Sequence, residues 1–225
     1  MIGIIAAMPI ERDAILAKMQ KVEEQCISQI SMFTGELSNK KVVLMLSGVG
    51  KGNAAMSTTI LLEHFEIDAI INVGTAGGLL HEQKVLDIVI SKQVVQHDFD
   101  TSGLDGKDGI GLFYEADPQL ISDCKSVLSS NDYQTFTGLI ASGDQFIYEE
   151  NKIVNLLENF PATMCVEMEA GAIAQVCTHY QVPFVILRSL SDIACKEKSE
   201  MDFMEYAKKA SARSAVCCEK LLSLR

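Results

Sequence analysis

The sequence predicts an α/β protein with three layers, in which helices cover both faces of a central mixed, largely parallel twisted sheet. Short apolar runs of strand length alternate along the chain with segments whose apolar residues recur at helical spacing. Of the 225 residues, 48% are hydrophobic, which is enough for one sizeable core. No repeat, low-complexity tract or linker interrupts this pattern, so we expect a single domain over residues 1–225.

The first half of the chain contains the most regular alternation. After a short apolar run, Pro9 suits the first turn of a helix whose apolar residues follow at helical spacing. Ser38 and Asn39 separate two alternating segments and predict a hairpin-like turn. The strands expected in this half are residues 2–7, 31–37, 41–47, 68–73 and 85–95, and the helices are residues 9–20 and 53–65.

The segment from Asp98 to Gly111 differs from its surroundings because glycines and aspartates dominate it. It predicts a loop, and one near the upper end of ordinary connections, which favours a role as a lid or an interface. Regular alternation resumes after it. The strands expected there are residues 135–141, 162–167 and 183–189, and the helices are residues 118–130, 149–158, 169–180 and 200–223.

The charge balance is acidic, with 30 acidic against 19 basic residues and a formal net charge of −11. An acidic protein is a poor partner for nucleic acid or for an anionic membrane surface, and we expect neither. No apolar run approaches the length needed to span a bilayer. A small anionic ligand held by a few local groups stays compatible with this charge.

The seven cysteines are odd in number and scattered, which is typical of reduced thiols rather than of a disulfide framework. The apolar start of the chain lacks the basic flank and the length of a secretory signal. We therefore expect a cytoplasmic protein. The four histidines lie far apart and no metal-ligand motif is present, so we expect neither a metal site nor another cofactor.

Acidic residues follow three of the expected buried strands. Glu11 comes after the first strand, Glu167 and Glu169 come after the strand at 162–167, and Asp192 comes after the last strand. Carboxylates in such places are costly to desolvate and are candidates for proton transfer. Acids just before a helix also stabilise its N-terminus, so each cluster alone is equally consistent with a structural role.

Two glycine-rich segments follow expected strands. The segment S-G-V-G-K-G-N at 47–53 matches neither a Walker A loop nor G-x-G-x-x-G, and tight-turn geometry explains it better than phosphate binding. In G-T-A-G-G at 74–78, Gly77 and its neighbours allow close backbone approach to a ligand, and the hydroxyl of Thr75 can donate to it. Strand-to-helix turns also use glycine for purely steric reasons. Ligands of α/β folds bind outside the carboxyl ends of the strands, which would bring these segments together.

Six motifs in order cover nearly the whole chain and resemble those of one family, the bacterial 5′-methylthioadenosine/S-adenosylhomocysteine nucleosidases of the nucleoside phosphorylase superfamily. They are G-I-I-A-A-M-P-I-E (3–11), S-G-V-G-K-G-N-A-A (47–55), N-V-G-T-A-G-G-L (72–79), S-G-D-Q-F-I (142–147), V-E-M-E-A-G-A-I-A (166–174) and R-S-L-S-D (188–192). The resemblance implies a nucleoside phosphorylase-like fold and hydrolysis of an N-glycosidic bond, which releases adenine and a 5-thio-substituted ribose as in methionine salvage.

The resemblance also implies roles for the polar residues. Asp192 is the general acid that protonates the departing adenine, oriented by Ser191, while Glu11 positions and activates the attacking water. The ribosyl centre becomes oxocarbenium-like as the base leaves. Glu169 accepts hydrogen bonds from the ribose hydroxyls, with Glu167 and the backbone around Met168 assisting.

The remaining roles concern apolar walls and the choice of nucleophile. Phe146 and Ile147 match the adenine pocket, Met8 and Met168 would pack against the sugar, and Phe203 would pack against the base or the 5′ substituent, although core packing explains each apolar residue taken singly. Related phosphorylases have an arginine where this chain has Asn72, which favours water over phosphate. Arg188 is either an anion contact or an organiser of the acidic cluster. Arg12 is expected to point outward.

The stretch 97–113 departs from the family pattern, which has an aromatic, glycine-containing segment there. In the family this region helps to form the pocket for the 5′ substituent, partly across a homodimer interface. The preferred substrate therefore stays open among methylthioadenosine, S-adenosylhomocysteine, 5′-deoxyadenosine and a futalosine-type nucleoside. A purine nucleoside phosphorylase and a non-catalytic nucleoside-binding protein are the alternatives in function.

Overall fold

A ten-stranded mixed sheet forms the centre of the molecule in the computed structural model, which describes residues 1–128, 134–193 and 202–224, the first three of the last stretch by their backbone alone. Its strand order is β10-β6-β8-β9-β5-β1-β4-β3-β2, with β7 paired to β6. The strands are β1 (Ile2–Ala6), β2 (Gln20–Ile27), β3 (Ile30–Leu37), β4 (Lys40–Leu46), β5 (Ala69–Gly78), β6 (Ile88–Asp100), β7 (Ile110–Glu115), β8 (Thr135–Ser142), β9 (Thr163–Glu167) and β10 (Phe184–Ile193).

The strands around the site are mostly parallel. β1 pairs in parallel with β4 and β5, and β5 pairs in parallel with β10. Because β5 also pairs with β9, the strands β5, β10, β6, β8 and β9 close into a ring. This closure brings the ends of β5, β9 and β10 to one place, where β1 ends beside them. The carboxyl ends of these strands thus surround a single site, which is where ligands of α/β sheets bind.

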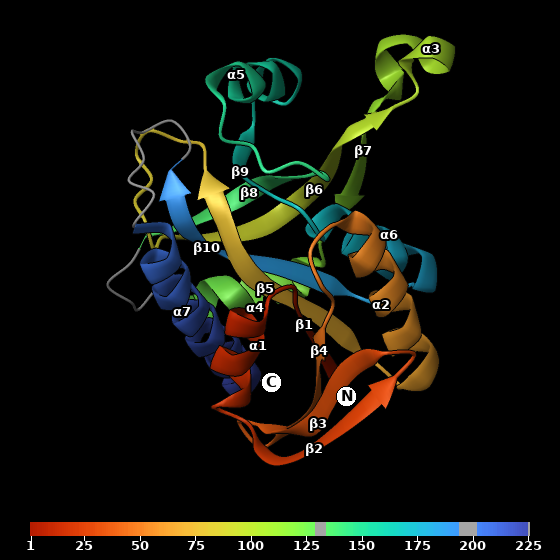
Figure 1. Ribbon diagram of the computed structural model, residues 1–225, viewed down its shortest axis with the longest axis vertical. Helices are drawn as coiled ribbons and strands as arrows, with labels where there is room; N and C mark the ends of the chain where they lie inside the picture. Colours follow the sequence, from red (N-terminus) through yellow and green to blue (C-terminus); the bar gives the residue numbers. More distant parts are fainter. Residues whose placement is uncertain (129–133, 194–201, 225) are drawn as a thin grey trace.

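Helices cover both faces of the sheet, as Figure 1 shows, with α1, α4 and α7 on one side and α2 and α6 on the other. Two separate clusters of buried apolar side chains fill these two layers. A third cluster lies beneath α5, at the end of the sheet where the site opens. The helices are α1 (Pro9–Leu16), α2 (Lys51–His64), α3 (Ser102–Asp105), α4 (Pro118–Leu128), α5 (Glu150–Asn159), α6 (Ala170–Tyr180) and α7 (Asp202–Leu224), with a 3₁₀ turn η1 (Gly106–Gly109).

The expected turn between β3 and β4 is confirmed. Ser38 and Asn39 both have positive φ, 52° and 61°, as a type I′ hairpin requires. The preceding strand, β2, was not expected from the sequence. It pairs only with β3 at the edge of the sheet and its side chains are almost entirely exposed, so it lacks the alternation that marks a half-buried strand.

Two corrections concern segments that glycine made look irregular. The segment 74–78 is no turn before a helix, because β5 continues through it and pairs with β9 and β10 up to Gly78. The stretch 98–111 is no simple loop either, since it holds the end of β6, α3, η1 and the start of β7. We call residues 98–113 the arm. Figure 1 shows α3 at its tip, away from the helical layers.

The α/β class with its mixed central sheet and two helical layers is confirmed. Within the described parts of the chain, no helix has both the length and the apolar character needed to cross a bilayer.

Candidate active site

A cavity of about 140 Å³ lies where β1, β5, β9 and β10 end, and it gathers most of the residues that the sequence pointed to. The predicted residues that line it are Met8, Glu11, Thr75, Gly77, Phe146, Ile147, Glu167, Met168, Glu169, Ser191 and Asp192. Five further residues line it without having been predicted: Ala7, Val49, Ala76, Gln145 and Val166. They belong to the same strand ends, so the predicted motifs marked the right segments but not every side chain.

Glu11, in the first turn of α1, accepts four hydrogen bonds. Its Oε2 accepts from the amides of Ala7 and Met8, each at 3.0 Å. Its Oε1 accepts from the amide and the hydroxyl of Thr75, at 3.0 and 3.3 Å. Burial raises the pKa of Glu11, while the nearby Arg188 and these amides oppose that shift. The carboxyl is therefore fixed in position and disposed to accept a proton.

Arg188 lies behind the cavity, in β10, with only 1% of its surface exposed. Its Nη2 donates to Oδ1 of Asn72 at 2.6 Å and to Oε2 of Glu167, and it lies 3.9 Å from Oε2 of Glu169. A buried ion is stable only when such partners compensate for lost hydration. Of the two roles left open for Arg188, organising the acidic cluster is the one that this geometry favours.

Gly74 explains how the guanidinium and Glu11 come together. A methyl group at Gly74 would lie 2.8 Å from Nη1 of Arg188 and 3.0 Å from Oε1 of Glu11. These distances are too short for any side chain. The glycine therefore leaves room for a buried cation beside a buried carboxylate, a function that the sequence motif alone did not reveal.

Glu167 and Glu169 differ in what binds them. Glu167 accepts from the amides of Glu169 and Ala170 at the start of α6, in addition to Arg188. Its oxygens are thus engaged with the protein. Oε1 of Glu169 accepts from the amide of Gly50 at 2.9 Å. Burial and the neighbouring charge of Glu167 raise the pKa of Glu169 to about 7, against the opposing effects of Arg188 and the Gly50 amide.

Asp192 also lines the cavity, and it lies within β10 rather than after it. Its Oδ1 accepts from the hydroxyl of Ser191 at 3.0 Å, as expected for an orienting serine. β10 has an irregularity between Leu190 and Asp192, where it pairs with the end of β5. The carboxyl oxygens of Asp192 lie 3.5 and 3.7 Å from the place of a methyl group on Gly77. A methyl group at Gly77 would therefore make only ordinary van der Waals contact with this carboxyl.

The walls combine buried and exposed apolar side chains. Ile147 is buried, whereas the ring of Phe146 is 55% exposed at the mouth of the cavity. Met8 and Met168 face the same space. Phe203 lies in the first turn of α7, and its side chain falls outside the described residues, so its assignment stays a prediction. Arg12 points away as expected, towards Asp13 and the ring of Phe33.

Comparisons with known proteins show the family to which the chain belongs. The model of the Phosphorylase superfamily matches residues 1–223. A 5′-methylthioadenosine/S-adenosylhomocysteine nucleosidase from Marinomonas sp. (strain MWYL1) is 43% identical over 226 residues, covering 98% of this chain and 97% of the relative. The chain belongs to this nucleosidase family. A relative of the same name from Geobacillus sp. (strain WCH70) is 43% identical over 95% of this chain and 94% of its own.

Solved structures of the family have the same fold. The nucleosidase from Neisseria meningitidis in complex with methylthio-immucillin-A has a TM-score of 0.94 at 35% identity, covering 100% of this chain and 99% of its own. The enzyme from S. pneumoniae with a transition-state inhibitor has a TM-score of 0.92 at 35% identity, covering 99% and 98%. The resemblance inferred from the six motifs is therefore confirmed.

The site of this nucleosidase family member is built from carboxylates and backbone amides. Among the described residues, the side chains of His, Cys, Asp and Glu form no cluster of three or more that could hold a metal ion. The expectation that the reaction needs no cofactor stays a prediction.

Proposed function

We propose that this chain hydrolyses the N-glycosidic bond of 5′-methylthioadenosine and S-adenosylhomocysteine, releasing adenine and the 5-substituted ribose. The observation that carries this proposal is the arrangement of Glu11, Glu169 and Asp192 around one cavity in a member of the nucleosidase family. Two carboxyl groups that act on opposite sides of a scissile bond are what glycosidic hydrolysis requires.

In the proposed reaction, Asp192 gives a proton to N7 of adenine as the bond between C1′ and N9 breaks. Ser191 holds the carboxyl of Asp192 in place through the hydrogen bond of 3.0 Å that its hydroxyl donates. Phe146 and Ile147 line the cavity and would bind the base. A protonated base leaves with the bonding electron pair, and the ribosyl centre gains positive charge.

Water then bonds to C1′ and gives up its proton to Glu11. The four donors to Glu11 fix its position, and its raised pKa suits a group that must accept a proton. Glu169 would accept hydrogen bonds from the ribose hydroxyls, and Met8 and Met168 would pack against the sugar. Glu167 contributes by holding the start of α6, because its own oxygens are already bound.

Charge favours water over phosphate as the nucleophile. Glu11, Glu167 and Glu169 are all buried and outnumber the single guanidinium of Arg188. A phosphate dianion beside these carboxylates would be repelled, and anion sites of this kind need uncompensated cations. Asn72, in the place of a phosphorylase arginine, accepts from Arg188 instead of offering a positive charge.

Adenine release from methylthioadenosine, measured with and without phosphate, tests the proposal. We expect the same rate in both conditions. Strict dependence on phosphate would establish a phosphorylase. Thermal stabilisation by the nucleoside without any release of base would establish a binding protein. A panel of methylthioadenosine, S-adenosylhomocysteine, 5′-deoxyadenosine and a futalosine-type nucleoside then identifies the preferred 5′ substituent.

The proposal includes a homodimer of single-domain subunits that each comprise residues 1–225. Apolar side chains on the arm and at the start of α2 support it, because Leu104 is 89%, Met56 is 52% and Val49 is 48% exposed. A second copy of the chain would cover such side chains. Light scattering of the purified protein should give twice the subunit mass.

A cytoplasmic location is also proposed. Every cysteine within the described part of the chain is a free thiol, and five of these six are buried. Thiols of this kind persist in a reducing compartment.

A further inference from the structure

Three charged residues from distant parts of the chain close a ring beside the cavity. The backbone amide of Lys51 donates to Oδ1 of Asp144 at 2.7 Å, and the ammonium of Lys51 donates to Oδ1 of Asp98 at 2.6 Å. The amide of Asp144 completes the ring by donating to Oδ2 of Asp98 at 2.9 Å. We call Lys51, Asp98 and Asp144 the charged ring. It joins the start of α2, the end of β6 and the segment after β8.

Two of the side chains of the charged ring are largely buried. The side chains of Lys51 and Asp98 are only 18% and 19% exposed, and the ammonium also donates to Oε1 of Gln96 at 3.2 Å. Burial raises the pKa of Asp98, but the bonds from Lys51 and from the Asp144 amide outweigh it and the net pKa is lowered. Asp98 is thus held in its charged form. An ion pair that gives up water needs these further hydrogen bonds to persist.

The ring connects two walls of the cavity that have different proposed tasks. The residue before Lys51 is Gly50, whose amide binds the carboxylate of Glu169 at 2.9 Å. The residues after Asp144 are Gln145, Phe146 and Ile147, which line the cavity where the base would bind. Lys51 therefore directly follows the residue that binds Glu169, and Asp144 directly precedes the segment where the base would bind.

We propose that Lys51, Asp98 and Asp144 are positioning residues of this site, which hold the Gly50 amide against Glu169 and fix the segment 145–147 relative to it. The inference rests on the proposed function and deepens it, since neither Lys51 nor Asp98 lines the cavity. Catalysis by bound groups depends on their mutual placement, and a shift of about 1 Å can cost on the order of a hundredfold in rate.

Loss of the hydrogen bond from the Gly50 amide to Glu169 would also change the pH dependence of kcat/KM. Glu169 faces Glu167, Glu11 and Arg188, and the Gly50 amide is one of the groups that favour its charged form. Without that amide the pKa of Glu169 rises further, so Glu169 becomes protonated at a higher pH in the variant than in the wild type. The acidic limb of the kcat/KM profile should therefore move to higher pH.

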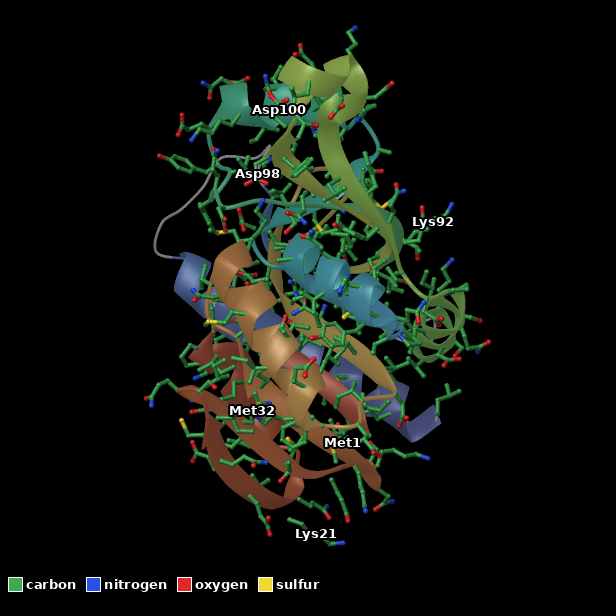
Figure 2. All side chains as sticks on the ribbon, turned by 90° about the vertical axis from the view of Figure 1, so that its right-hand side faces the viewer. Met1, Lys21, Met32, Lys92, Asp98 and Asp100 are labelled. Carbon is green, nitrogen blue, oxygen red and sulfur yellow. The ribbon has the colours of Figure 1, made fainter. Side chains whose placement is uncertain are left out.

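The test compares Lys51→Met and Asp144→Ala with the wild type, using adenine release from methylthioadenosine. In Lys51→Met we expect kcat/KM to fall about 10- to 100-fold, mainly in kcat, with the acidic limb moved to higher pH. The double variant should lose no more than the Lys51→Met variant, because both changes open the same ring. Lys21→Met is the matched control. It breaks an ion pair with Glu36 at the opposite end of the molecule from Asp98, as Figure 2 shows, and should change neither value.

Each result decides the matter. A folded Lys51→Met variant with wild-type kcat/KM and an unmoved acidic limb overturns the proposal. If Lys51→Met fails to fold, the exposed Asp144 takes over the test, and wild-type behaviour of Asp144→Ala overturns the proposal. If the wild type releases no adenine, the proposed function fails, and hydrogen exchange decides on the ring alone. The amides of residues 48–52 and 143–147 should then exchange faster in Lys51→Met, and equal rates would contradict the ring's role.

Discussion

The buried acidic cluster and the arm are built in opposite ways. In the cluster, Glu11, Glu167 and Glu169 are each less than a tenth exposed, and Arg188 offsets part of their charge. In the arm, Leu104 is 89% exposed at the tip on a helix of four residues. The cluster is fixed by bonds within the subunit, whereas the arm offers apolar surface to something outside it.

This difference separates chemistry from selectivity. Bond cleavage needs charges held in place, and the cluster holds them largely with backbone amides, which are present whatever side chain most donor residues have. The choice of a 5′ substituent needs a surface that can vary, and the arm holds most of the stretch 97–113 that was expected from the sequence to depart from the family pattern. We therefore expect changes in the cluster to affect rate and stability, and changes in the arm beyond Asp98 to affect substrate preference.

The largest effect is expected for Asp192→Asn. An amide cannot supply the proton that the leaving adenine needs, so kcat should fall about a thousandfold or more while the protein stays folded. Adenine release and thermal unfolding measure the two quantities. Asp68→Asn changes a carboxyl that is 80% exposed and bound to the chain's amino terminus, and it should leave the rate unchanged. Near-wild-type turnover in the Asp192 variant would remove this residue as the acid.

Arg188→Met tests the cluster as a stabilising unit. Loss of the guanidinium leaves Glu167 and Asn72 without their common donor, and unpaired buried charges are costly. The free energy of unfolding should fall by about 3 kcal/mol, as measured with a chemical denaturant. Arg12→Met, which removes a more exposed pair with Asp13, should cost less than about 1 kcal/mol. Equal losses in both variants would show that the buried arginine is not the organiser of the cluster.

Glu169→Gln separates function from stability. Because its pKa is about 7, Glu169 becomes protonated as the pH falls through 7, and wild-type kcat/KM should fall there too. The variant should lose about a hundredfold in kcat/KM and show no such limb.

The stability of the Glu169→Gln variant should increase where its activity decreases. Between the ordinary pKa of about 4.5 and the folded value of about 7, the folded state holds more protons than the unfolded state, so this carboxyl's contribution falls as pH rises. At about pH 8 the full cost of the buried charge is present, and Glu169→Gln should be more stable than the wild type by on the order of 1 kcal/mol. A less stable variant at that pH would mean that the carboxylate is well compensated.

The cluster could be predicted from the sequence better than the contacts that hold it. Apolar runs placed β1, β9 and β10, so Glu11, Glu167 and Asp192 were expected at strand ends and were found around one cavity. The amide of Gly50 gave no such signal. It binds a carboxylate 119 residues away, and a backbone donor at a glycine turn looks the same whether or not it has a distant partner.

The errors in the predicted fold have a common physical cause, which is that burial pattern and glycine content do not report pairing. β2 pairs along its length with β3 while its side chains face solvent, so no alternation revealed it. In β5, Gly74, Gly77 and Gly78 resembled a turn. They lie within the strand, and at Gly74 and Gly78 other groups come too close for a side chain, such as Gln83, Leu190 and Ile193 at Gly78. In the arm, the same residue type does mark short turns.

The smallest effect is expected in the arm, and it is an effect on preference. If Leu104 of one subunit covers the 5′ group in the site of another, Leu104→Ser removes an apolar contact with the methylthio group but none with adenosine itself. The ratio of kcat/KM for methylthioadenosine to that for adenosine should fall, by less than about tenfold, because one apolar contact is worth little. Val22→Ser, which changes an exposed apolar residue on β2, should leave the ratio unchanged. An unchanged ratio in Leu104→Ser would place the arm away from the 5′ group, and selectivity would then have to come from the walls of the cavity itself, where Val49 and Met8 are the apolar candidates.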